Sequence, residues 1–309
     1  MKYNEFIEKV ASGIRAYFGE ETRVEVKKVT KNNGVILDGI IIMNRNETIA
    51  PTIYMETFYR EYQNGKMLGD IIMEIITIYK QNRISGSVNL DFFMKYESVK
   101  GRVFQKVINY EKNKKSLENV PHIRFLDLAV VCYYAYMNDF LGNGSIQIEV
   151  GHLDQWGISE EELFEDAKRN TYEKLGLELK GMDEILIEML SEKLDNEDHE
   201  ETNEILNRMD YEIPMYVMTL RGRYYGAACI CYQEYLQTFA KRCKKSFYIL
   251  PSSIHELILI PDSGREKSDV LQNMVHEVNT THVSEEEQLS DNIYYFSISD
   301  NQVTVIQNM

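Results

Sequence analysis

The chain has 309 residues, of which 44% are hydrophobic and 11% aromatic, so it is long enough for two packed domains of a globular protein. Its formal net charge of -15 argues against a broad nucleic-acid-binding surface, because such surfaces need Lys and Arg to neutralise phosphates. No segment approaches the roughly 20 apolar residues that cross a bilayer, and the first residues lack the apolar core of a signal peptide. The four cysteines are too few for a disulfide scaffold, so we expect a cytoplasmic protein without a membrane segment.

The first part of the chain predicts a helix, a hairpin and two further helices. Apolar residues at every fourth position of 3–18 predict an amphipathic helix that ends at Gly19. The sequence Asn32-Asn33-Gly34 favours a tight turn between two apolar strands. A short strand broken at Pro51 and a helix closed by Asn64-Gly65 follow, and "MLGDIIMEIITIYKQNR" predicts the next helix.

The middle of the chain contains the predicted domain boundary. Residues 90–113 have a helical period that Gly101 interrupts, and a basic, polar stretch follows them. We place an N-terminal α+β module at residues 1–118 and a C-terminal α+β module at 119–309, the latter with an acidic helical insertion at about 176–212. Beyond the boundary, "IRFLDLAVVCYYAYM", a Gly-Asn-Gly turn and "SIQIEV" predict a second hairpin.

The C-terminal part alternates hairpins with helices. Ser159 followed by Glu162 is typical of a capping box, which begins a helix that runs to about Gly176. Further on, "MYVMTL", "SFYIL" and "ELILIP" predict strands, "CICYQEYLQTFAKRC" a helix between them, and 265–278 another helix before a final hairpin around Asp300-Asn301. Hairpins separated by helices favour an α+β fold of two modules with mostly antiparallel sheets, not a βαβ alternation.

The stretch "ILPSSIHELILIPD", residues 249–262, offers the candidate catalytic residues. Ser252 or Ser253 could act as a nucleophile, with His255 as base and either Glu256 or Asp262 to orient the base. The alternative interpretation is a polar turn between two buried strands, in which the serines satisfy free backbone N–H groups. The G-x-S-x-G pattern of a nucleophile elbow is absent, so the turn is the favoured interpretation.

Other motifs predict neither a metal nor a cofactor. Cys229, Cys231 and Cys243 lack the paired spacing of a zinc site. His255-Glu256 and His276-Glu277 each begin like H-E-x-x-H, but neither is followed by the second histidine. Phosphate-binding glycine loops are also missing from the sequence.

Several longer segments carry a resemblance to a known family. They are "VTKNNGVILDGIII", "APTIYMETFYREYQNG", "WGISEEELFEDAKRNT", "LPSSIHELILIPD" and "LSDNIYYF". With these segments, nearly the whole chain resembles an uncharacterised family of bacterial domains of unknown function that is common in gut anaerobes. The resemblance implies a bacterial, cytoplasmic protein of two modules, and it implies no reaction.

Three hypotheses of function follow. The first is a non-enzymatic protein that binds another protein or a small ligand, because the pattern is globular and contains no complete catalytic motif. The second is a serine hydrolase that uses Ser253 and His255. The third is an acidic mimic of nucleic acid, for which the acidic run from Asp195 to Glu204 is the motivating feature.

Overall fold

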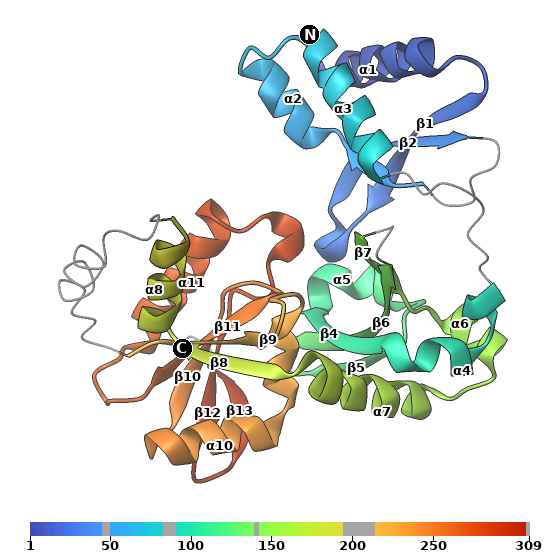
Figure 1. Ribbon diagram of the computed structural model, residues 1–309. Coiled ribbons are helices and arrows are strands. Elements are labelled where there is room, and N and C mark those ends of the chain that lie inside the picture. The colour runs from blue at the N-terminus through green and yellow to red at the C-terminus, as the bar shows by residue number, and fades with distance from the viewer. Residues whose placement is uncertain (45–49, 83–90, 139–141, 194–213, 307–309) are drawn as a thin grey trace. The chain divides into compact units, whose positions relative to one another are not determined.

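The computed structural model describes residues 1–309 except 45–49, 83–90, 139–141, 194–213 and 307–309 (Figure 1). Two compact units are present. One consists of Met1–Arg102 with Tyr134–Ile146, and the other of Val103–Tyr133 with Gln147–Met309. Helices and mostly antiparallel strands make up both, so the predicted α+β class is confirmed.

The first unit begins with a helix and a three-stranded antiparallel sheet of order β1-β2-β3. Its helices and strands are α1 (Tyr3–Phe18), β1 (Thr22–Thr30), β2 (Ile36–Asn44), β3 (Thr52–Tyr54), α2 (Glu56–Gln63), α3 (Leu68–Asn82) and α4 (Tyr96–Val99). The turn between β1 and β2 contains Asn33 with a φ of 60°, a left-handed conformation that Asn tolerates. The predicted first helix, hairpin and two following helices are all confirmed.

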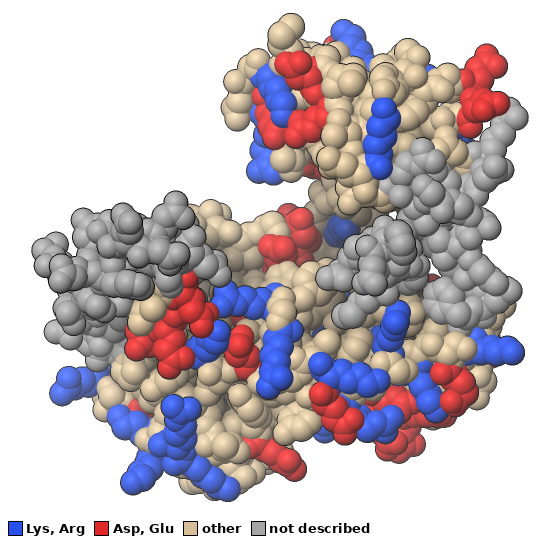
Figure 2. Space-filling view, in the orientation of Figure 1, with Lys and Arg blue, Asp and Glu red and all other residues tan. Residues whose placement is uncertain are grey.

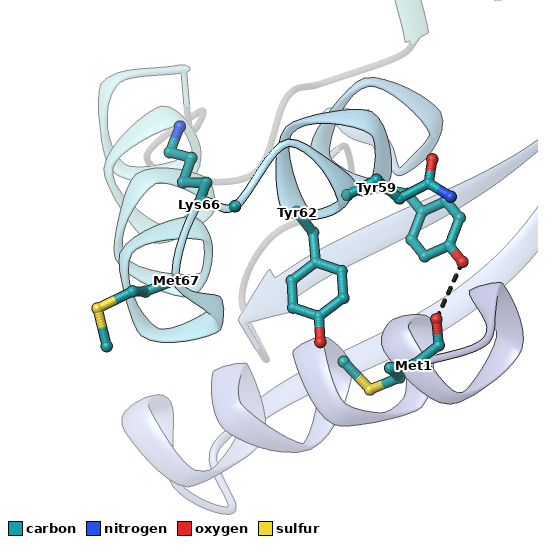
Figure 3. A pocket seen from close by; sticks show the side chains of 7 residues that line it. Met1, Tyr59, Tyr62, Lys66 and Met67 are labelled. Atoms are coloured by element: carbon teal, nitrogen blue, oxygen red, sulfur yellow. Dashed lines mark hydrogen bonds between the residues drawn. The ribbon is translucent and has the colours of Figure 1, made fainter.

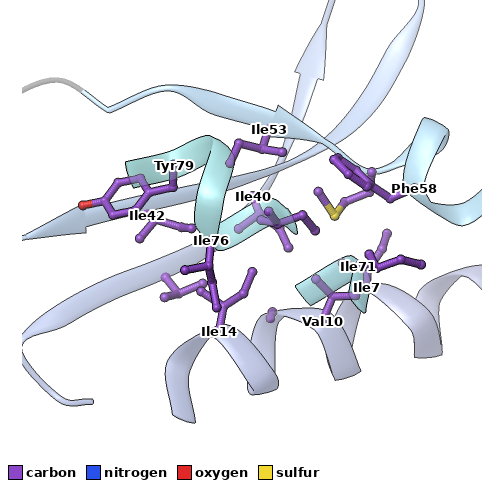
Figure 4. Packing of buried hydrophobic residues seen from close by; sticks show 14 of the residues in the cluster. Ile7, Val10, Ile14, Ile40, Ile42, Ile53, Phe58, Ile71, Ile76 and Tyr79 are labelled. Carbon is purple, nitrogen blue, oxygen red and sulfur yellow. The ribbon is translucent and has the colours of Figure 1, made fainter. Parts of the chain in front are cut away.

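Apolar side chains of α1, β2 and α3 form the core of the first unit (Figure 4). Phe6, Val10 and Ile14 recur every four residues on one face of α1, and Ile40 and Ile42 point from one face of β2. The members from α3 are Ile71, Ile75, Ile76 and Tyr79. Each full burial of such a side chain is worth about 1.5–3 kcal/mol, which explains why this arrangement of helices and sheet forms.

The second unit contains a six-stranded sheet of order β13-β12-β10-β11-β9-β8. The helices and strands of the rest of the chain are β4 (Val103–Asn109), α5 (Tyr110–Leu117), β5 (His122–Phe125), β6 (Leu128–Asn138), β7 (Gly142–Gln147), α6 (Val150–Trp156), α7 (Glu160–Asn170), β8 (Leu177–Gly181), α8 (Met182–Lys193), β9 (Tyr216–Leu220), α10 (Gln233–Cys243), β10 (Phe247–Pro251), β11 (Glu256–Pro261), α11 (Ser268–Thr281), β12 (Ile293–Ser297) and β13 (Gln302–Ile306). A smaller sheet has the order β4-β6-β5, and β7 also pairs with β6.

Helices cover both faces of the six-stranded sheet. On one face, the ring of Phe239 in α10 lies 4.9 Å from that of Phe247 in β10. On the other, Leu271 and Val275 of α11 pack into a buried cluster with Leu250 of β10. Successive residues of a strand point to opposite faces, so Phe247 and Leu250 serve different layers.

Residues 103–109 form strand β4, although the sequence period of residues 90–113 predicted a helix. Its four apolar residues, Val103, Phe104, Val107 and Ile108, are all buried, and the strand packs against both α7 and the 3-10 helix η5 (Gly226–Cys231). A strand that is buried on both faces has apolar residues at odd and at even positions, so the period of its apolar residues does not distinguish it from a buried helix.

The expected domain boundary at residues 118 and 119 lies within the second unit, after α5. Leu117 and Val120, on either side of it, are buried in one cluster with Ile108, Ala129 and Val131, so this polar-looking stretch is packed. In the two compact units, the chain passes from the first to the second between Arg102 and Val103, and Tyr134–Ile146 returns to the first. The expected insertion at 176–212 begins with β8 and α8, and its acidic run lies outside the described residues.

The carboxylate of Asp127, in the turn between β5 and β6, binds two side chains from the segment that leads into β12 and one from β12 itself. Its Oδ2 accepts hydrogen bonds from Ser290 Oγ (2.6 Å) and Asn292 Nδ2 (3.0 Å), and its Oδ1 accepts one from the Tyr294 hydroxyl (2.8 Å). Tyr294 is fully buried, and burial together with the Asp127 charge raises the pKa of its hydroxyl. One carboxylate thus joins the small sheet to the six-stranded sheet.

Candidate functional site

The stretch that carries the candidate catalytic residues is a hairpin turn. Strands β10 and β11 are antiparallel, with Pro251 opposite Leu257 and Phe247 opposite Pro261. Residues 252–255 connect them, in agreement with the interpretation as strand, turn and strand.

Both serines bond within this turn. The Oγ of Ser253 accepts a hydrogen bond from the backbone N–H of His255 (3.0 Å). The hydroxyl of Ser252 donates to Glu256 Oε1 (3.2 Å). The structure therefore brings Ser252 and Glu256 together, whereas the contact between Ser253 and His255 involves the backbone of the histidine and not its ring.

The His255 ring has other partners. Its Nδ1 accepts a hydrogen bond from the backbone N–H of Tyr225 (3.1 Å), and its Nε2 lies 3.6 Å from Glu287 Oε1. A ring nitrogen that accepts a hydrogen bond is unprotonated, so the ring is neutral and carries its proton on Nε2. Burial lowers the pKa of His255 below its usual value, and the Glu287 carboxylate opposes this effect.

Three tyrosines and a lysine complete the surroundings of this ring. Tyr225 stacks on His255 with 5.7 Å between the ring centroids, and Tyr133 meets Tyr225 edge-on at 4.9 Å. The Lys106 ammonium lies 4.6 Å from the Tyr225 ring centroid, within the range of a cation–π contact. The ring of Tyr224 lies 5.1 Å from that of His255 and is the exposed member of the group.

The loop from Arg221 to Gly226 holds Tyr225 in place in an unusual backbone conformation. Both Arg223 (φ 56°) and Tyr225 (φ 55°) are left-handed, which costs on the order of 1–3 kcal/mol for each residue without compensation. A Cβ on Gly226 would overlap Thr219 Oγ1 and the carbonyl oxygen of His255, so only glycine permits this approach. The hydrogen bond to His255 is one of the contacts that offset the strain.

On the other side of this loop lies a pocket of about 290 Å³. Its lining residues are Glu178, Lys180, Met182, Ile185, Val217, Thr219, Arg223 and Glu256. Thr219 of β9 stands opposite Glu178 of β8 and opposite Glu256 of β11, so the three side chains form a row across neighbouring strands. Below this row, Met182, Ile185 and Val217 supply an apolar floor.

The cations of the pocket are paired with acids. Lys180 Nζ lies 2.7 Å from Glu188 Oε1 and 3.6 Å from Glu178 Oε1, and Arg223 reaches Glu188 at 3.5 Å. The lining itself contains two carboxylates, Glu178 and Glu256, and two cations. Glu188 lies outside the lining and binds both cations, so with it the group has three carboxylates to two cations. Such a pocket favours a cationic ligand.

Adjacent residues His255 and Glu256 thus belong to different environments. His255 is the last residue of the turn and Glu256 is the first residue of β11, and the contacts of His255 are with the tyrosines whereas Glu256 lines the pocket. The sequence singled out both residues but not their partners. Tyr225, Lys106 and Glu287 come from three distant segments, and only the crowding of tyrosines and the acidic run at 285–287 hinted at them.

The cysteines are buried or half-buried thiols. Burial raises the pKa of Cys231 to about 12 and the pKa of Cys229 further, so neither is a thiolate at neutral pH. Both lie in η5, and not in the helix predicted to contain them, because Tyr232 departs from helical backbone before α10 begins. Within the described part of the chain, no three Cys, His, Asp or Glu side chains are grouped to hold a metal ion.

A wider, open pocket of about 620 Å³ lies in the first unit, between Tyr59, Tyr62, Lys66, Met67 and the first residue (Figure 3). Lys66 already binds Glu61 (2.8 Å) and Glu74 (2.5 Å), and the side chains of Lys66 and Met67 point away from the tyrosines. We therefore take the pocket beside Glu256 as the candidate site.

Comparison with known proteins adds the family. The model of DUF5688, a family of unknown function, matches residues 3–298. The chain belongs to this family. Neither the curated proteins nor the solved structures contain a match to this DUF5688 member. Among its described helices, none is long and apolar enough to cross a membrane.

Proposed function

We propose that this DUF5688 member is a cytoplasmic, non-enzymatic binding protein and that its pocket accepts a small organic cation with an apolar body. The observation that carries the proposal is the row of Glu178, Thr219 and Glu256 above an apolar floor. Carboxylates attract the cationic group, Thr219 lies between them, and the floor accepts the apolar part. Such a ligand would displace little water from Lys180 and Arg223, because both already have acidic partners.

The described geometry favours binding over hydrolysis. A serine hydrolase needs an imidazole nitrogen within hydrogen-bond reach of the serine hydroxyl. In this hairpin, Nδ1 of His255 is occupied by Tyr225 and Nε2 faces Glu287, while Ser253 bonds to backbone. We therefore do not carry the hydrolase hypothesis further.

A nucleic-acid mimic would need acids along one continuous face. Figure 2 shows acidic and basic side chains interspersed over the face in view. The acidic run from Asp195 to Glu204 lies outside the described residues. The described surface in this view does not favour the mimic.

Isothermal titration calorimetry with three probes of equal chain length tests the proposal. The probes are hexylamine, 1,6-diaminohexane and hexanoate, and the variants are Glu256→Gln, Glu178→Gln and the control Glu165→Gln. We expect saturable binding of both amines, a loss of about tenfold in affinity in Glu256→Gln, and unchanged binding in the control, whose exposed acid is on α7. Hexanoate that binds as tightly as hexylamine, or a Glu256→Gln variant that binds like wild type, would contradict the proposal.

A further inference from the structure

The loop from Arg221 to Gly226 contacts both environments through residues two positions apart. Arg223 lines the pocket and pairs with Glu188. Tyr225 donates its backbone N–H to Nδ1 of His255. Both residues are left-handed, so the backbone between the pocket and the histidine is held in one uncommon conformation.

Several elements contribute polar or charged groups to the surroundings of His255. These groups are Tyr224 and Tyr225 from the loop, Lys106 from β4, Tyr133 from β6, Glu287 from η6 (Glu285–Glu287) and Glu256 from β11. Glu287 and Glu256 favour a protonated ring, whereas burial and Lys106 oppose it. The His255 ring therefore lies between groups that favour its protonation and groups that oppose it. The same ring binds the loop, through the hydrogen bond from the Tyr225 N–H to Nδ1.

We propose that His255 is a pH-sensitive latch: its protonation releases the Tyr225 backbone and weakens the binding of a cation in the pocket. This inference rests on the proposed function of the pocket. A protonated ring carries N–H on Nδ1, which would face the N–H of Tyr225 as a second donor, so the hydrogen bond is lost. The loop then loses a contact that offsets its strained backbone, so the wall that it forms at the pocket loses its fixed shape.

Charge acts in the same direction. A positive His255 competes with the bound cation for the field of Glu256, which is the next residue in the chain. By linkage, a cation bound at Glu256 lowers the pKa of His255 by the same coupling. Affinity is therefore full while the ring is neutral and falls as the pH drops through the pKa of His255, which lies below the usual 6.5.

Variants of three residues outside the pocket lining test the latch. In His255→Asn, the amide oxygen takes the place of Nδ1 as acceptor and does not titrate. Hexylamine affinity is measured from pH 7.5 to 5, and we expect a loss of about fivefold in wild type and a flat profile in His255→Asn. Glu287→Gln should move the midpoint to lower pH and Lys106→Met to higher pH, because these residues raise and lower the pKa of His255 respectively. A profile in His255→Asn as steep as that of wild type would overturn the proposal, as would a midpoint that neither charge variant moves.

Nuclear magnetic resonance of the protein without ligand separates the latch from the proposed function. We expect the backbone amide signals of Tyr225 and Arg223 to titrate together with the His255 ring in wild type and to stay constant in His255→Asn. If these signals titrate but hexylamine does not bind, the proposed function fails, and of the latch only the coupling between His255 and the loop stands. If hexylamine binds but the amide signals of Tyr225 and Arg223 do not change as His255 titrates, the latch is overturned and the proposed function stays intact.

Discussion

The two units are stabilised in different ways. In the first, α1, α3 and the three-stranded sheet meet through a continuous apolar cluster that includes Phe6 and Ile75. In the second, single polar groups join segments that are far apart in the chain: Asp127 binds residues 290–294, and His255 binds Tyr225. The stability of the first unit should therefore follow buried volume, and that of the second should depend on individual hydrogen bonds and on pH.

The largest effect is expected in the apolar cluster. Phe6→Ala removes a fully buried ring and should destabilise the first unit by about 3–5 kcal/mol, because the neighbours do not close the cavity. Native-state hydrogen exchange of the α1 and β2 amides measures this change. Met67→Ala, at a side chain that is 72% exposed, is the matched control and should stay within about 0.5 kcal/mol of wild type. A loss below about 1 kcal/mol in Phe6→Ala would contradict the comparison.

A smaller effect is expected at the carboxylate of the second unit. Asp127→Ala should cost about 2–3 kcal/mol, because the buried hydroxyl of Tyr294 loses its acceptor. A double-mutant cycle with Tyr294→Phe, followed by exchange of the β12 amides, isolates this contact, and we expect a coupling of at least about 1 kcal/mol. Asp154→Ala, at an exposed acid of α6, serves as control. If the stability loss of the double variant equals the sum of the losses of the two single variants, Asp127 does not stabilise Tyr294.

The smallest effect is the pH dependence of stability that His255 confers. Its pKa in the folded protein is lowered from 6.5, chiefly by burial, so the unfolded chain binds the proton more tightly. The stabilisation is therefore complete above about pH 6.5 and is lost as the pH falls from there through the folded-state pKa. Urea denaturation at pH 7.5, 6.5 and 5.5 should give a steeper decline in wild type than in His255→Asn. Equal declines would assign the pH dependence to other groups.

The sequence predicted the turn of the candidate site but not the partners of its side chains. The polar residues after Pro251 indicated a turn, and the structure has one, in which the Ser253 hydroxyl accepts a hydrogen bond from the backbone N–H of His255. The roles of His255 and Glu256 could not be derived in the same way. Their partners, Tyr225 and Thr219, are about 30 or more residues distant, and no periodic pattern connects positions that far apart.

The order of residues was enough to predict the helix at 3–18, the hairpin at Asn33-Gly34, the cap at Ser159 and the α+β class. These follow from residue period and turn chemistry, which act over a few neighbours in the chain. Tertiary structure alone decided that Val103–Asn109 is a strand and that adjacent residues His255 and Glu256 face a tyrosine cluster and a charged pocket. Burial on both faces hides a strand's period, and sheet pairing, not chain proximity, selects the partners of each side chain.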